Sequence, residues 1–221
     1  MTVEYHNQSM IEGLRRLGYV QVAKNVFLAE WSSNDVAHYI KNRPYAYVRG
    51  TPAAYIQINF GFKNSPVQKF SRECAEKYVS EIFGKRLPRH HFDNRFFVHS
   101  GQYKNHSVEL CEYNMTPEHI AEVIIMSAEN YILPRVDRLL TLDAMLSVLV
   151  SDVEPLGWEG NNPILRSAQI IALAVMTGTR TVSELRKPIQ PFEWRIRSQM
   201  HRSGPVEKFL DRVAADALEK F

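Results

Sequence analysis

The sequence predicts an α+β protein, with helices and an antiparallel sheet in the N-terminal half and an all-helical C-terminal half packed against that sheet. Before Tyr113, apolar residues alternate with polar ones, the spacing of strands that bury one face. After Tyr113 they recur every three to four residues, as on one face of a helix. Strands and helices that are segregated in this way favour α+β over alternating βαβ units.

The size and composition of the chain are those of a globular protein. Its 221 residues can bury one sizeable core, and 45% hydrophobic with 23% charged residues is ordinary. We expect residues 1–114 to form a helix plus the antiparallel sheet. Residues 115–221 are expected to form a helical region, packed on the sheet as one globular unit.

The N-terminal half begins with an expected helix over residues 7–19, ended by Gly18 just past its last turn. Strands are expected at 26–31 and, most clearly, at 53–62, where apolar and polar residues alternate strictly. The stretch 35–42 is ambiguous, and the Pro and Gly of 43–52 indicate a connection or an irregular edge.

A second helix is expected over residues 71–84, with Ser71 as its N-cap and Gly84 at its end. Two short strand-like stretches follow, at 95–99 and 107–113, joined by a hairpin loop.

The C-terminal half carries four helical patterns. The first ends or kinks at Pro134, because proline lacks the amide hydrogen that continues a helix. The patterns span residues 116–132, 138–150, 162–178 and 204–221. The last pattern has an apolar stripe of Val206, Phe209, Leu210, Val213 and Ala217.

Four short motifs carry a resemblance to a known family. They are "LRRLGY" at 14–19, "VFLAEW" at 26–31, "IQINFGF" at 56–62 and "ENYILPRVDRLLTLDAML" at 129–146. In this order the chain, up to about residue 150, resembles a small bacterial family of unknown function, with a helix, an antiparallel sheet and a helical "YxLP" segment. Ala29 or Glu30 stands where that family has an arginine, and Arg135 where it has an aromatic residue.

The resemblance implies a fold and a setting, but no chemistry. Such families occur near toxin and immunity loci, which implies a protein-binding or neutralising role. The region after residue 155 lies outside the resemblance and reads as an extension.

The stretch 85–106 is the first candidate site. It holds four of the eight histidines, and five Lys and Arg residues against Asp93 alone. Three interpretations are open: a metal site, a phosphate or nucleic-acid surface with phenylalanines among the cations, or a polar loop. Adjacent histidines on a strand point to opposite faces, so His90 and His91 do not easily share one ion, and no metal-binding motif is present.

The stretch 186–202 is the second candidate. It also holds five Lys and Arg residues against one acid, Glu193. As a helix it would place Arg195 outward and leave Trp194 and Ile196 partly buried. Either a solvated helix face or an anion-binding surface fits this pattern.

The sequence gives little support to an enzyme. No nucleophile-elbow, phosphate-loop or dinucleotide glycine motif occurs. Cys74 adjoins the apolar stripe of the 71–84 helix and is expected to be a buried structural thiol. With no signal peptide and only two cysteines, the chain is expected to be cytoplasmic, without cofactor, metal or membrane association.

The expected function is non-enzymatic protein binding of an immunity-like or regulatory kind. A nucleic-acid or phosphate-ligand protein is the alternative, and a metal-dependent hydrolase that uses the His/Asp cluster is the third possibility. The oligomeric state stays open. The candidate binding residues are Arg89, His90, His91, Asp93, Arg95, His99, Arg195 and Arg197.

Overall fold

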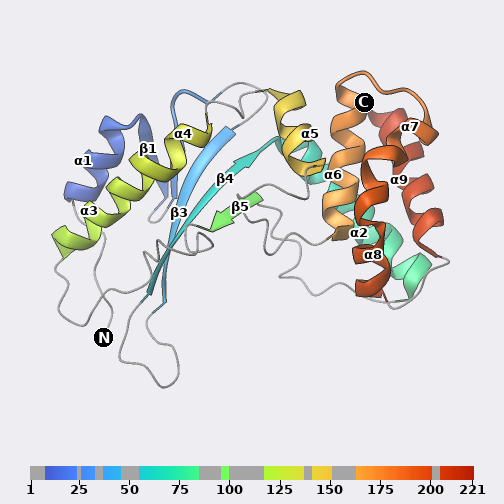
Figure 1. The fold of residues 1–221 in the computed structure, drawn as a ribbon, viewed down its shortest axis with the longest axis horizontal. Helices are drawn as coiled ribbons and strands as arrows, with labels where there is room; N and C mark the ends of the chain where they lie inside the picture. The colour runs from blue at the N-terminus through green and yellow to red at the C-terminus, as the bar shows by residue number, and fades with distance from the viewer. Residues whose placement is uncertain are drawn as a thin grey trace. The chain divides into compact units, whose positions relative to one another are not determined.

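The computed structural model confirms the α+β class (Figure 1). In the described part of the chain, every strand lies before residue 100 and only helices follow from residue 117. The change of rhythm near Tyr113 therefore agrees with the order of the described strands and helices. The described residues are 8–23, 26–32, 37–45, 55–84, 96–99, 117–136, 141–150, 163–200 and 205–221.

The chain divides into two compact units, each assembled from separate segments. The sheet unit contains residues 1–62, 96–140 and 155–159. The helical unit contains residues 63–95, 141–154 and 160–221. The helix before the last strand thus belongs to the helical unit, and the first helices of the C-terminal half belong to the sheet unit.

The sheet has five strands in the sequential order β1-β2-β3-β4-β5. Strands β1 and β2, β2 and β3, and β4 and β5 form antiparallel pairs. The expected strands at 26–31, 53–62 and 95–99 are confirmed, and the ambiguous stretch 35–42 contributes to β3 from residue 37 onward. Strand β3 continues to Tyr45, so the beginning of the stretch 43–52, expected as a connection or an irregular edge, is strand. The short strand β1 was not expected. The strand bounds are β1 Tyr19–Ala23, β2 Val26–Ala29, β3 Ala37–Tyr45, β4 Tyr55–Lys63 and β5 Phe96–His99.

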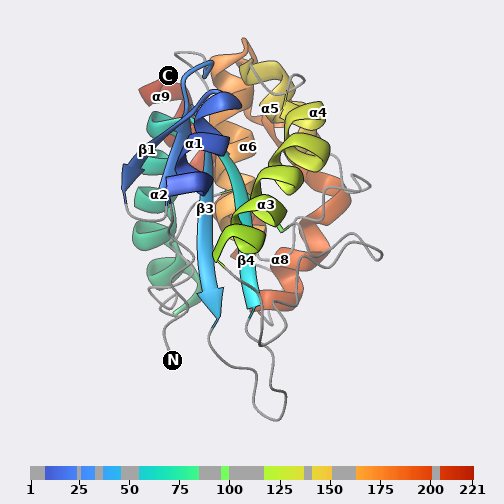
Figure 2. The same cartoon turned by 90° about the vertical axis from the view of Figure 1, so that its left-hand side faces the viewer.

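Helix α1, Gln8–Arg16, packs closely on helix α3, Pro117–Ser127, in the sheet unit. Both helices lie on the same side of the sheet in the two views (Figures 1 and 2). Helix α3, the first helix of the C-terminal half, therefore covers one face of the sheet together with α1. A β-carbon at the buried Gly13 of α1 would overlap the Ile125 side chain of α3. Gly18 ends α1 as expected, with a φ of 79°.

Pro134 distorts its helix without ending it. Helix α3 continues through a π-helical turn, η3 at Ala128–Ile132, into α4 at Leu133–Val136. The proline ring would clash with the carbonyl of Asn130 in a regular helix, and a wider turn relieves that clash. The expected kink or end is thus realised as a π turn directly before the proline.

Helix α2 opens the helical unit at Ser65–Phe83. Its N-cap is Asn64, whose side chain accepts a hydrogen bond from the Val67 amide at 3.0 Å. The expected cap at Ser71 is wrong, because Ser71 is buried within the helix and its hydroxyl donates to the Gln68 carbonyl at 3.0 Å. The expected end is confirmed by Gly84, which has a φ of 63°.

Helix α6, Pro163–Met176, forms the centre of the helical unit. It contacts α2, α5 at Leu142–Val150 and α9 at Pro205–Lys220 (Figure 1). Every residue from Ile164 to Val175 is buried. The expected apolar side of this helix is confirmed, but its polar residues are buried as well.

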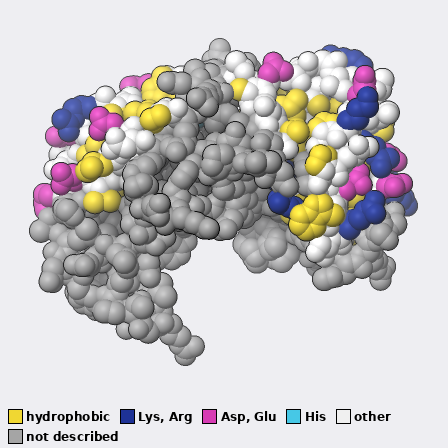
Figure 3. Space-filling model, viewed as in Figure 1, with side chains coloured by type: hydrophobic (Ala, Val, Ile, Leu, Met, Phe, Trp, Pro, Cys, Tyr) yellow, Lys and Arg dark blue, Asp and Glu magenta, His cyan; other side chains and the backbone are white. Residues whose placement is uncertain are grey.

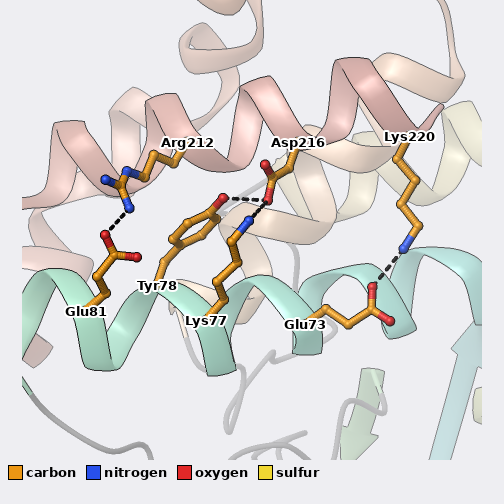
Figure 4. A network of polar contacts seen from close by, with 7 residues as sticks. All are labelled: Glu73, Lys77, Tyr78, Glu81, Arg212, Asp216 and Lys220. Atoms are coloured by element: carbon orange, nitrogen blue, oxygen red, sulfur yellow. Dashed lines mark hydrogen bonds and ion pairs between the residues drawn. The ribbon is translucent and has the colours of Figure 1, made fainter.

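Helices α2 and α9 run antiparallel and are joined by three rungs of opposite charge (Figure 4). Lys220 pairs with Glu73 at 2.8 Å, Lys77 with Asp216 at 3.2 Å, and Arg212 with Glu81. The rungs follow each other at intervals of four residues on both helices, and the sign alternates along each helix. A slip of one turn would therefore bring like charges together, so we infer that the ladder favours this register.

The described helices include none with the combined length and apolar character that a bilayer-spanning segment requires.

Candidate functional site

The first candidate stretch lies almost entirely outside the described residues. This holds for Arg89, His90, His91, Asp93 and Arg95. The backbone of His99 ends β5, where it pairs with Asn59 of β4. The three interpretations of this stretch, as metal site, phosphate surface or polar loop, stay predictions.

The second candidate stretch forms most of a series of three short, consecutive helices in the helical unit. The series consists of helix α7 at Val182–Arg186, the 3₁₀ helix η4 at Lys187–Phe192 and helix α8 at Glu193–Met200. Thr181 caps α7 by accepting a hydrogen bond from the Glu184 amide at 3.3 Å. The fully buried Leu185, Ile189 and Ile196 anchor the three helices in turn. These anchors hold the intervening polar side chains at fixed places on the surface.

Arg186 stands among three carboxylates from two helices. Its guanidinium lies 3.4 Å from Asp211 Oδ1 and 4.0 Å from Glu207 Oε1, both on α9. It also lies 3.9 Å from Glu193 Oε1, at the start of α8. Arg186 therefore ties α7 to α8 and α9, and its charge is neutralised within the fold.

Arg197, one of the predicted binding residues, is also engaged internally. Its Nη2 atom lies 3.2 Å from Glu193 Oε2, one helical turn earlier on α8. The Glu193 side chain is only 14% exposed and lies between Arg186 and Arg197. Two of the five cations counted from the sequence are thus held by acids. On the face that Figure 3 shows, acidic and basic side chains are interspersed on the helical unit.

Trp194 on α8 is a large hydrophobic residue that is 60% exposed to solvent. The expectation that Trp194 and Ile196 are both partly buried is wrong. Residues two apart on a helix point about 200° apart, so the fully buried Ile196 directs Trp194 outward. The guanidinium carbon of Arg195 lies 5.2 Å from the centre of the Trp194 ring, within the range of a cation–π contact.

A set of polar side chains inside the helical unit was missed from the sequence. Arg166 on α6 is 3% exposed, and its Nε donates to the Leu149 carbonyl in the last turn of α5 at 2.8 Å. Gln169 lies 3.5 Å from the hydroxyl of Ser71 on α2, and its Oε1 meets no donor among the described residues. Helix-end carbonyls lack partners in their own helix, so Arg166 serves α5 as a cap from the interior.

The cysteine that the structure describes is buried and carries no disulfide. Cys74 on α2 is 3% exposed, and burial raises the pKa of its thiol to about 12. This confirms the buried thiol expected from the sequence, because the reactive form is the thiolate. Within the described ranges, no three His, Cys, Asp or Glu residues are grouped so that they could hold a metal ion.

The sheet unit contains a buried aromatic cluster. Trp31 lies between Tyr19, at 5.6 Å between ring centres, and His38 of β3, at 5.1 Å. Both flanking residues are almost fully buried, and burial raises the pKa of the Tyr19 hydroxyl far above its ordinary value. Burial therefore keeps this phenol protonated at neutral pH.

Comparison of the chain with protein-family models, with curated proteins and with solved structures finds no match in any of the three.

Proposed function

We propose that the protein is a non-enzymatic protein-binding module whose contact surface centres on Trp194 and Arg195 of α8. The supporting observation is the 60% exposed Trp194 on a helix that is anchored by the buried Ile196. Trp and Arg are among the residue types that contribute most binding energy at protein interfaces. A rigidly presented aromatic side chain also loses little conformational entropy when a partner covers it.

The charges around α8 favour a protein partner over nucleic acid. Arg186 and Arg197 are held by carboxylates, so a phosphate would compete with ion pairs that already exist. Glu207 and Asp211 are exposed beside Arg186 and would repel a phosphate backbone.

An immunity-like partner is the more specific form of the proposal. Its support is the resemblance of four short motifs to a small bacterial family of a kind that occurs near toxin and immunity loci. A toxin gene next to the gene for this chain would support it, and that toxin would be the first partner to purify and test.

The proposal is tested with three forms of the chain as bait in lysate of the source cells: wild type, Trp194→Ala and Met126→Ala. Met126 is a matched control, because it is 52% exposed on a helix of the other unit. A protein retained by wild type and by Met126→Ala, but lost with Trp194→Ala, is then purified. Its affinity for Trp194→Ala should be weaker by about 30-fold or more, as for a central interface residue.

Nucleic acid is tested in parallel by titrating single-stranded and duplex oligonucleotides at two salt concentrations. Affinity that falls steeply with salt and is lost in Arg195→Ala and Arg197→Ala would overturn the proposal in favour of a phosphate-binding surface. A partner that binds all three baits equally would also contradict the assignment to Trp194.

A further inference from the structure

We draw no further inference here: the strongest candidate, the exposed surface of α8 around Trp194 and Arg195, already carries the proposed function, and nothing in the described residues shows what covers it.

Discussion

Asp216 of α9 receives two donors from α2 on a single oxygen, the Tyr78 hydroxyl at 2.6 Å and Lys77 Nζ at 3.2 Å (Figure 4). The Tyr78 side chain is almost fully buried, whereas the Lys77 side chain is 59% exposed. The hydroxyl depends on this one acceptor more than the ammonium group does, because water can solvate the exposed ammonium.

Asp216→Ala is therefore expected to destabilise the protein more than Asp216→Asn. Asparagine removes the charge but keeps a side-chain oxygen that accepts the hydrogen bond from Tyr78. Alanine leaves the buried Tyr78 hydroxyl without an acceptor, which costs about 1–3 kcal/mol of unfolding free energy. Urea unfolding of both variants measures the difference. In a Tyr78→Phe background the difference should shrink, and an unchanged difference would show that the hydrogen bond is not its cause.

Reversal of the charge ladder tests whether it fixes the register of α9 on α2. The triple variant Arg212→Glu, Asp216→Lys, Lys220→Glu opposes like charges at all three rungs and should lower the thermal midpoint. Adding Glu73→Lys, Lys77→Glu and Glu81→Lys restores opposite charges and should recover the part of the loss that comes from charge repulsion. Full recovery is not expected, because a lysine at position 216 cannot accept the Tyr78 hydrogen bond and an acid at position 220 opposes the helix dipole.

Salt supplies the control for that series. The ladder side chains are at least 30% exposed, so high salt should narrow the gap between the triple variant and wild type. A six-fold variant no more stable than the triple variant would contradict the register argument.

Gly13→Ala is expected to destabilise the sheet unit, although this change usually stabilises a helix interior. The new methyl group would overlap the Ile125 side chain, and overpacking typically costs about 1–3 kcal/mol. Ile125→Val removes the Cδ1 atom that lies nearest the new methyl group. The loss of unfolding free energy in the double variant should therefore be smaller than the sum of the losses in the two single variants. Additive losses, or a stabilised Gly13→Ala, would contradict the close packing of α1 on α3.

Cys74 is expected to resist alkylation in the folded protein. With its pKa raised to about 12, the thiol remains protonated at pH 8 and is buried as well. In a Cys111→Ser background, iodoacetamide should label Cys74 only after unfolding. Because the unfolded thiol ionises at lower pH than the folded one, stability should fall as the pH rises from about 9 toward 12. Rapid labelling under native conditions would place Cys74 on an accessible surface.

Helix α9 shows how a periodic apolar face makes an element predictable from the sequence. Its expected apolar stripe is buried, because apolar residues spaced three to four apart fall on one face of a helix, and that face packs against the core. The stripe consists of Val206, Phe209, Leu210, Val213 and Ala217. Helix α6 was predicted less well. Arg166 and Gln169 are polar and therefore predict an exposed face, but the neighbouring helices bury both side chains, which the local sequence does not reveal.

The site was harder to predict than the fold, because its chemistry depends on residues far apart in the sequence. The excess of cations at 186–202 predicted a basic surface, yet Asp211 and Glu207, which neutralise Arg186, lie on the next helix. The exposure of Trp194 could have been predicted, since a helix that buries Ile196 turns the residue two positions earlier outward.

The proposal that α8 binds a protein is tested most directly by a photoreactive amino acid placed at position 194 in living cells. The account predicts one discrete protein adduct from position 194, which is absent when the same amino acid stands at position 126. Adducts to nucleic acid, or the same adducts from both positions, would contradict it.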